Sequence, residues 1–389
     1  LVLRRGSRRR RRAVIVEKRR SEAGSEDEYY VHYEGTDRRL DEWTRRNQIQ
    51  KIVLPADAPA ENTVRKTTRV RKRKRIELSE SPKPPAIEDG LDVLRKEHEE
   101  VTKVKNIERI RYGNYEIDTW YFSPYPDDFG KTRNLFICHY CMRYMKIEKS
   151  YRAHLLRCAK KKPPGTEIYK EKSISVYEVP GSCNKSYCQC LCLLAKLFLD
   201  NKTLYFDVEP FIFYVLCEVD KSGAYMVGYF SKERGNPDGN NLACICILPP
   251  FQRSGYGKFL IQLSELSKSI AFSGYELSKR EGLIGSPEKP LSDLGSLSYR
   301  SYWSWVIMEV IRSCSKITIA DLSRKTAVHA DDIRDTLQTL DLTRYWKGNP
   351  VLYVTQQLLD RCGKAGICKR PRLLLQPRLL RWNPKRASV

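Results

Sequence analysis

The sequence predicts an α+β protein built around a mixed β-sheet with helices on its faces, with a zinc-binding module and a small β-barrel before it. The first observation is residues 241–258, where an apolar run ends at two prolines and leads through a glycine turn into a helix start. The second is a set of cysteines and a histidine at zinc spacing over residues 138–158. The third is a series of short alternating segments over residues 13–43.

The composition limits the class of protein. With 389 residues, of which 41% are hydrophobic, the chain can form two or three domains with real cores. The formal charge of +24 favours nucleic acid, chromatin or an anionic membrane as a partner. No apolar run reaches the length of a membrane span, and no secretory signal is expected before the first arginines. The 13 cysteines are spaced for metal and core positions, which favours a reducing compartment.

The N-terminal part predicts a basic tail, a barrel and a linker. Arginines dominate residues 1–12, and the alternating segments over 13–54 predict the small barrel. Residues 55–102 are rich in Pro, Ser, Thr and charge and predict a disordered basic linker, whose cluster Arg69–Arg75 is typical of nuclear import. Three barrel aromatics either line a face for methyl-lysine or nucleic acid or form the barrel core. These are Tyr30, Tyr33 and Trp43.

The part over 103–172 contains the metal candidates. The two-residue gap places Cys138 and Cys141 on one turn, and the three-residue gap places His154 and Cys158 on one face of a helix. Four ligands without an evident open position predict a closed, structural Zn²⁺ site. His139 is interpreted as a non-ligand. The alternative is a chance spacing of buried cysteines.

The part over 173–300 predicts the main sheet. The expected elements are strands at 173–179, 204–206, 212–219, 225–230 and 242–248, a strand at 117–122 before them, and a helix at 187–199. The turn Asp220–Gly223 predicts a hairpin, and the strand at 242–248 is expected at the centre of the sheet. The turn at 252–258 would direct backbone N–H groups at a phosphate, with Arg253 and Lys258 beside it, although a Gly-x-Gly turn alone is also typical of plain turns.

The C-terminal part over 301–370 predicts a winged-helix-like lobe. Helices are expected after Trp303, at 319–323 and at 331–340, followed by a strand at 351–354. Such a lobe either binds DNA or serves as a scaffold beside a substrate groove. A basic tail is expected over 371–389.

Several of these motifs together resemble the MYST family of histone acetyltransferases over roughly residues 13–370. Gln252–Gly257 resembles the acetyl-coenzyme A loop of acetyltransferases, and Cys244 with Ser286–Asp293 resembles this family in particular. The segments at 115–118, 123–126 and 237–241 are most similar to the males-absent-on-the-first branch, which acts on histone H4. The resemblance implies a GNAT-like acyltransferase core dependent on acetyl-CoA, a C2HC zinc finger and an N-terminal chromo-barrel, or Tudor-knot.

The resemblance also implies roles for single residues. A lysine amine with its ordinary pKa near 10.4 is protonated at neutral pH, so the reaction needs a carboxylate base, and Glu288 matches it. Cys244 matches the active-site cysteine, which either carries the acetyl group or lies beside it. Lys202 matches the self-acetylated lysine of the family (autoacetylation). The residues implied for cofactor binding are Ile245, Cys246, Ile247, Arg253, Ser254, Gly255, Tyr256, Gly257, Lys258, Ser292 and Ser301.

The implied protein is a nuclear enzyme that acts on the histone H4 tail of the nucleosome. The resemblance further implies membership of a chromatin complex of the male-specific-lethal type, and basic segments and the chromo-barrel are candidates for DNA or RNA contacts. Two alternatives stay open. One is a catalytically impaired chromatin-binding scaffold of the same family, and the other is a zinc-containing nucleic-acid-binding protein.

The chain departs from the family pattern in three places. About ten extra residues follow Phe259–Ile261, and as continuous helix they would add roughly 15 Å and turn the downstream face by about 80°. Glu288 is therefore expected to reach the site only if these residues loop out, with Gly274 as a break. Cys246 is a second thiol where the family has a larger apolar residue or threonine. Arginines replace a strand upstream of the barrel, so the barrel is expected to be incomplete.

Overall fold

The computed structural model describes residues 2–3, 10–21, 26–50, 104–200, 202, 206–236, 239–269, 285–314, 317–346, 349–352, 355, 357, 361 and 368–381. The chain divides into two compact units. One consists of residues 1–105 with 120–122, and the other of residues 106–119 with 123–389. The predicted linker over 55–102, with its basic cluster, lies outside the described residues. Among the described residues, no helix is long and apolar enough to cross a membrane.

The first unit is a small antiparallel sheet with a compact core. Strands β3 (Ala13–Arg20), β4 (Asp27–Tyr33) and β5 (Glu42–Arg45) pair in that order, and short 3-10 helices η1 (Arg38–Leu40) and η2 (Arg46–Gln48) flank β5. Upstream, β1 (Val2–Leu3) pairs with β2 (Arg10–Arg11), and Val2 bridges Ile49. Val2 is buried with Val31, Tyr33 and Ile49. The predicted tail over 1–12 thus contains two short strands, because the apolar Val2 precedes the arginines and packs into the core.

The second unit begins with a zinc module, residues 106–158. Its four-stranded sheet has the order β7 (Tyr115–Asp118), β6 (Arg109–Tyr112), β8 (Asn134–Ile137) and β9 (Tyr144–Met145), with β6 and β8 parallel. The 3-10 helix η4 (Asp127–Phe129) precedes β8, and helix α2 (Glu148–Arg157) closes the module. The strand predicted over 117–122 ends at Asp118, so only its first two residues are confirmed.

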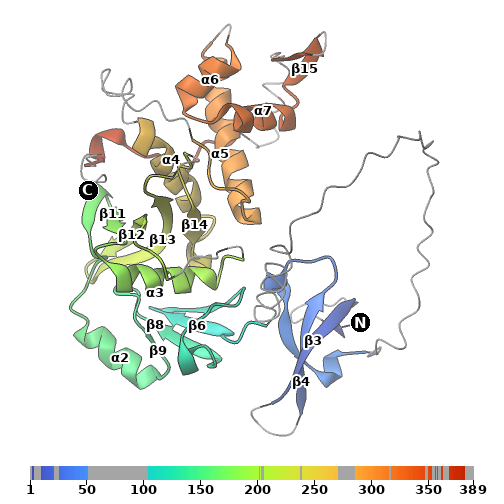
Figure 1. The fold of residues 1–389 in the computed structure, drawn as a ribbon, viewed down its shortest axis with the longest axis vertical. Coiled ribbons are helices and arrows are strands. Elements are labelled where there is room, and N and C mark those ends of the chain that lie inside the picture. The colour runs from blue at the N-terminus through green and yellow to red at the C-terminus, as the bar shows by residue number, and fades with distance from the viewer. Residues whose placement is uncertain are drawn as a thin grey trace, which may run out of the picture. The chain divides into compact units, whose positions relative to one another are not determined.

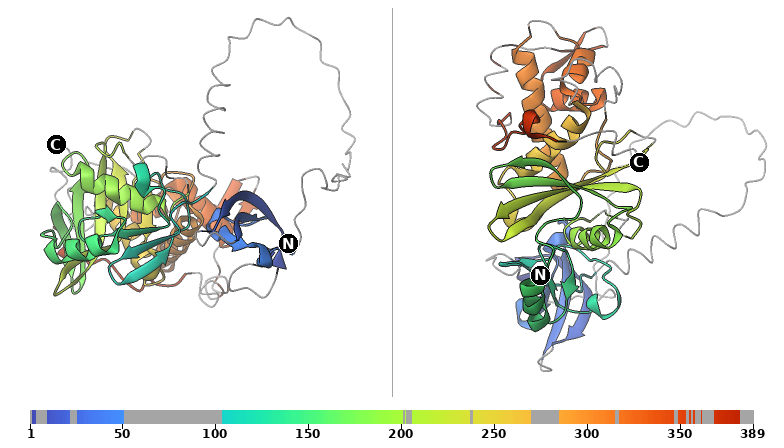
Figure 2. Two further views of the ribbon diagram at one scale, coloured as in Figure 1. Left: turned by 90° about the horizontal axis from the view of Figure 1, so that it is seen from below. Right: turned by 90° about the vertical axis from the view of Figure 1, so that its left-hand side faces the viewer.

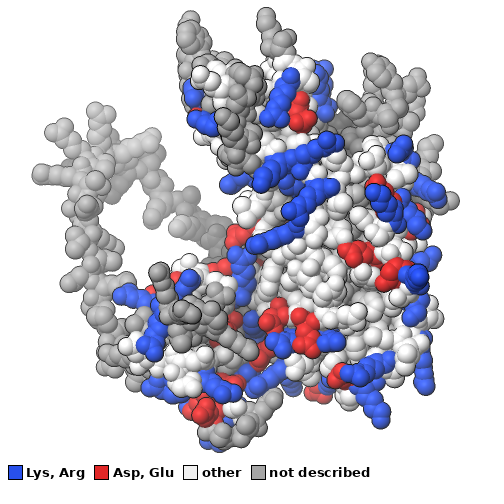
Figure 3. Space-filling view, turned by 180° about the vertical axis from the view of Figure 1, so that it is seen from behind, with Lys and Arg blue, Asp and Glu red and all other residues white. Residues whose placement is uncertain are grey.

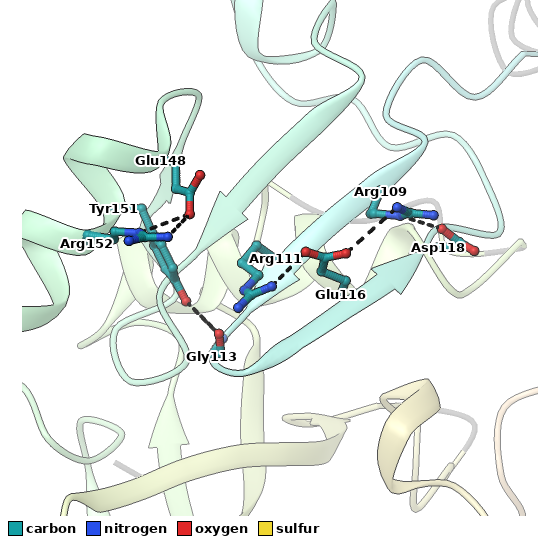
Figure 4. A network of polar contacts seen from close by, with 8 residues as sticks. All are labelled: Arg109, Arg111, Gly113, Glu116, Asp118, Glu148, Tyr151 and Arg152. Atoms are coloured by element: carbon teal, nitrogen blue, oxygen red, sulfur yellow. Dashed lines mark hydrogen bonds and ion pairs between the residues drawn. The ribbon is translucent and has the colours of Figure 1, made fainter.

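Figure 4 shows how polar contacts tie this module together. Arg109 pairs with Asp118, and Arg111 with Glu116, across β6 and β7. These pairs are exposed, so each contributes little to stability. The contact between Gly113 and Tyr151 joins the β6–β7 turn to α2, with the Gly113 amide donating to the Tyr151 hydroxyl at 2.9 Å.

The main sheet has five strands in sequence order. They are β10 (Thr166–Glu171), β11 (Ile174–Pro180), β12 (Phe211–Asp220), β13 (Gly223–Glu233) and β14 (Cys244–Ile247). Helix α3 (Lys185–Lys196) lies between this sheet and the zinc module (Figures 1 and 2). The strands predicted at 173–179, 212–219 and 225–230, the helix at 187–199 and the hairpin turn are confirmed. The strand predicted at 204–206 falls largely outside the described residues.

The placement of the strand at 242–248 at the centre of the sheet is wrong. β14 is shorter, pairs antiparallel with β13 and stands at the end of the sheet. All pairs within this sheet are antiparallel, and a parallel bridge between Leu242 and Pro287 supplies the mixed character. The apolar run suggested a central strand because β14, although terminal, is covered. Helix α4 (Tyr256–Ser269) packs on β13 and β14, so this terminal strand is covered on one face as a central strand would be.

Helix α4 begins three residues before the expected Phe259, after the 3-10 helix η5 (Pro249–Phe251). Helices α5 (Asp293–Arg312), α6 (Ile319–Thr326) and α7 (Ala330–Thr339) and the hairpin of β15 (Thr343–Trp346) and β16 (Asn349–Leu352) form the C-terminal lobe. They confirm the winged-helix-like prediction.

Residues 368–381 return from this lobe to the main sheet. Leu380 bridges Tyr169 in β10, and 3-10 helix η7 (Pro377–Leu379) precedes it. The predicted tail over 371–389 is thus part of the folded unit up to Arg381.

Candidate active site and zinc centre

The four predicted zinc ligands meet at one point. The ligand atoms of Cys138, Cys141, His154 and Cys158 all lie within 4.8 Å of one another. Cys138 Sγ is 3.9 Å from Cys158 Sγ, and Cys141 Sγ is 3.3 Å from His154 Nε2. A tetrahedral Zn²⁺ with Zn–S bonds of about 2.3 Å has ligand edges of roughly 3.8 Å, so these residues fit the metal.

The surroundings of the cluster suit zinc as well. Hydrogen bonds from Cys138 and from the Arg143 amide, with a smaller contribution from His154, outweigh burial and lower the pKa of the Cys141 thiol to about 4. The thiolate is the form that binds metal. His139 is not part of the cluster among the described residues. Its ring packs 4.0 Å from that of Tyr140, and burial lowers its pKa to about 4, in agreement with the non-ligand prediction.

Cys244 faces a buried lysine. It is the first residue of β14 and pairs with Ser231 of β13. The Nζ atom of Lys202 lies 3.6 Å from Cys244 Sγ, and the Lys202 side chain is buried. Burial works most strongly against the charge of Lys202, but its interactions with Cys244 and Cys192 together outweigh burial and raise its pKa. Lys202 therefore keeps its positive charge, and its ammonium group lies against the Cys244 thiol.

Cys192 is a further thiol beside Lys202, in a helix for which the sequence predicted no site residue. It lies on α3, is buried and interacts with Lys202. An apolar helical pattern gave no signal for this role. Cys246 follows Cys244 by two residues and is buried, and burial raises its pKa to about 12. The second thiol is therefore held neutral.

The segment that carries Glu288 lies directly beside the strand leading into β14. The Asn241 amide donates to the Ser286 carbonyl at 3.1 Å, and the Glu288 amide donates to the Leu242 carbonyl at 2.8 Å. The Glu288 side chain is exposed. The Glu288 backbone is thus hydrogen-bonded to Leu242, which precedes Cys244 by two residues. This is the placement expected if the extra residues loop out. Residues 270–284, with the expected break at Gly274, lie outside the described residues.

The predicted phosphate turn has backbone geometry that suits close approach of an anion. Arg253 and Gly255 have positive φ angles of 63° and 99°, and α4 begins at the next residue, so its first amides point out of the turn. Gln252 fixes the entry because its side-chain amide donates to the Ile247 carbonyl at 2.9 Å. A Cβ atom on Gly255 would lie 3.2 Å from Arg372 Cβ, so glycine leaves room that no other residue would.

Cations surround this turn. The Lys258 Nζ donates to the Lys369 carbonyl at 3.4 Å, and the Arg372 guanidinium donates to the Arg253 carbonyl at 3.1 Å. Burial and the charge of Lys369 lower the pKa of Lys258. A bound phosphate would relieve both effects, so the turn fits the phosphates of coenzyme A. The contribution of residues 368–375 was missed, because a basic, proline-broken sequence gives no sign of where it packs.

The other predicted site residues lie in β14, in the turn, in helix α4 and in or directly before helix α5. The Ser292 hydroxyl caps α5 and accepts from the Gly295 amide at 3.1 Å. Ser301 lies within α5 and is partly buried. Ile245 and Ile247 lie in β14, and Ser254 is exposed in the turn.

Tyr256 is the first residue of α4, and its hydroxyl donates to the Glu218 carboxylate. Gly257 follows it, and a Cβ there would meet only Ser298 Oγ at 3.7 Å.

The barrel aromatics are mostly inside. Tyr30 and Tyr33 are buried, with exposures of 2% and 0%, which favours the core alternative for both. The Trp43 ring lies 5.3 Å from that of Tyr30, and the Arg19 guanidinium stands 3.8 Å over it. One face of the Trp43 ring therefore already has a cation over it, and the residue as a whole is partly buried.

Comparisons with known proteins agree with this geometry. Residues 162–380 match the model of the MOZ/SAS family, residues 104–158 match the MYST family zinc finger domain, and residues 1–51 match the RNA binding activity-knot of a chromodomain.

Curated relatives match along nearly the whole chain. Histone acetyltransferase MOF of Drosophila melanogaster is 44% identical over 94% of this chain and 50% of its own length. Putative MYST-like histone acetyltransferase 1 of Oryza sativa subsp. japonica is 49% identical over 92% of this chain and 77% of its own length. Histone acetyltransferase ESA1 of Saccharomyces cerevisiae is 38% identical over 92% of this chain and 86% of its own length. The chain thus spans half the length of the Drosophila relative.

Proposed function

Because the chain belongs to the MYST family of histone acetyltransferases, we propose that it transfers an acetyl group from acetyl-coenzyme A to a lysine ε-amine in the histone H4 tail. The H4 tail follows from the similarity to MOF and from the motifs shared with that branch. The observation that carries the proposal is the backbone register of Glu288 with Leu242, beside Cys244.

The residues of the chain divide the chemistry between them. Bound acetyl-coenzyme A supplies an activated acetyl thioester. The amides of the turn at 253–258, with Arg253 and Lys258, would hold the phosphates of the cofactor, and the backbone of β14 would hold its pantetheine arm. Glu288 removes a proton from the substrate ammonium and so makes the amine a nucleophile. Lys202 keeps a positive charge at Cys244, which either carries the acetyl group or lies beside it.

The charge of the chain supports a nuclear role on nucleosomes. Figure 3 shows Lys and Arg side chains grouped in several places on one face, with Asp and Glu in smaller groups. With a net charge of +24, the chain is attracted to nucleosomal DNA. Transcriptional regulation and membership of a male-specific-lethal type complex are part of the same proposal, as are nucleic-acid contacts of the first unit.

The test measures acetyl transfer to H4, H3 and H2B tail peptides by the purified full chain. We expect the H4 peptide to be acetylated at least tenfold faster than the others. Transfer without preference for H4 would leave the transferase and remove the H4 assignment. No transfer, with acetyl-CoA still raising the Tm of the protein, would indicate the catalytically impaired scaffold instead.

A further inference from the structure

A buried carboxylate of the C-terminal lobe holds the segment that carries Glu288. Asp332 lies on α7, and its side chain is 2% exposed. Its Oδ2 atom accepts a hydrogen bond from Ser286 Oγ at 2.6 Å, and its Oδ1 atom lies 3.0 Å from Lys289 Nζ. One carboxylate therefore binds the residues on both sides of Pro287 and Glu288.

The opposite edge of the same segment is held through the backbone. The amides of Asn241 and Glu288 and the carbonyls of Ser286 and Leu242 form the two bonds described above. Gly285, at the start of the segment, bridges Val328 just before α7. Residues 285–289 are thus fixed between the strand leading into β14 on one side and α7 on the other.

The contacts with Ser286 and Lys289 compensate for the burial of the Asp332 carboxylate. Burial of an ionised carboxylate is unfavourable unless it is paired and hydrogen-bonded, and here both oxygens have partners on the segment. Glu288 itself is exposed, and the contacts of Ser286 and Lys289 with Asp332 hold the backbone from which its side chain projects. Its position depends on its neighbours, and misplacement of a reacting group by about 1 Å can lower a rate roughly 100-fold.

Resting on the proposed function, we propose that Asp332 is a positioning residue for acetyl transfer. It contacts Ser286 and Lys289 and thereby fixes the general base Glu288 beside Cys244. Because α7 belongs to the C-terminal lobe, this carboxylate also connects that lobe to the chemical step.

The test uses Asp332→Asn, which keeps the size of the side chain and removes its charge. Asp335→Asn is the matched control, because Asp335 is exposed on the same helix. We expect kcat to fall at least tenfold in Asp332→Asn, with KM for acetyl-CoA within twofold of wild type. Lys289→Met, which removes one partner of Asp332, should lower kcat in the same direction, and Asp335→Asn should match wild type.

A second measurement does not depend on activity. Hydrogen exchange of the peptide covering residues 285–292 should be at least tenfold faster in Asp332→Asn than in wild type or Asp335→Asn, because the Glu288 amide loses its fixed position. Unchanged exchange would overturn the proposal, even if the wild type transfers no acetyl group and the proposed function itself fails. A kcat within twofold of wild type, or a parallel loss of kcat, cofactor affinity and Tm, would also overturn it.

Discussion

Lys202 Nζ and Cys244 Sγ lie 3.6 Å apart at the start of β14, with the lysine side chain buried. Lys202 lies in the connection between α3 and β12, and Cys244 lies two residues after Leu242, whose carbonyl accepts from the Glu288 amide. A cation and a thiol thus lie together where β14 begins, close to the backbone of the segment that carries Glu288.

Replacing Lys202 should change the reactivity of Cys244. In Lys202→Met the ammonium group that lies 3.6 Å from Cys244 Sγ is absent, so negative charge on the sulfur in the alkylation transition state loses a favourable neighbouring charge. We expect alkylation of Cys244 by iodoacetamide at neutral pH to slow by about tenfold, as measured by mass spectrometry of the peptide. Lys221→Met, in the exposed β12–β13 turn, is the control. Equal alkylation rates in all three proteins would contradict the role of Lys202.

Lys258 should make cofactor binding sensitive to pH. Its pKa is lowered by burial and by Lys369, and a bound phosphate would raise it again, so binding favours the protonated form. The affinity for acetyl-CoA should therefore fall as pH rises through the lowered pKa of Lys258, below the usual range of lysine. Calorimetric Kd values between pH 7 and 10 test this, and Lys258→Gln should weaken binding and flatten the profile. A similar profile in both proteins would argue against it.

Gly228 should be needed for the end of the main sheet. A Cβ atom there would lie 2.3 Å from Ile247 Cδ1 and 2.7 Å from the Cys246 carbonyl oxygen, so Gly228→Ala has to push β14 outward. We expect a loss of about 2 kcal/mol in the free energy of unfolding, measured by denaturant titration. Gly257→Ala, where the new atom meets only Ser298 Oγ at 3.7 Å, should change stability far less. Equal losses would show that the contact with β14 is not the cause.

Zinc should be structural and present once per chain. Cys141→Ser removes one ligand of the cluster, and we expect a lower metal content by mass spectrometry and a fall in Tm of roughly 10 °C or more. Cys183→Ser changes an exposed cysteine outside the cluster and serves as the control. A full zinc content and an unchanged Tm in Cys141→Ser would exclude this cluster as the metal site.

The sequence allowed local features to be predicted more reliably than tertiary placement. The zinc ligands, the hairpin at Asp220–Gly223 and the two helices of the C-terminal lobe follow from spacing and local periodicity, and the structure contains them. The predicted position of β14 in the sheet was wrong because an apolar run indicates burial and not strand order. Burial of Cys192 beside Lys202 was likewise invisible, because it depends on contacts between elements far apart in the chain.

The extra residues after Ile261 illustrate the same limit. Sequence spacing left two outcomes, a displaced downstream segment or a looped-out insertion. The choice between these outcomes depends on the hydrogen bonds that join residues 286 and 288 to residues 241 and 242. These bonds form only in the folded chain, so the sequence could not show them. The role of residues 368–375 at the phosphate turn depends in the same way on tertiary contacts, such as the bond from Arg372 to the Arg253 carbonyl.

The decisive experiment is the single-turnover rate of acetyl transfer to the H4 tail peptide by the wild type and by Glu288→Gln, both saturated with acetyl-CoA. Glu309→Gln, an exposed glutamate on α5, is the control. If Glu288 is the general base, its loss should slow transfer by about 100-fold or more at neutral pH, and Glu309→Gln should leave the rate unchanged. A Glu288→Gln enzyme that transfers acetyl at the wild-type rate would show that the segment at 285–289, although held beside Cys244, does not supply the base.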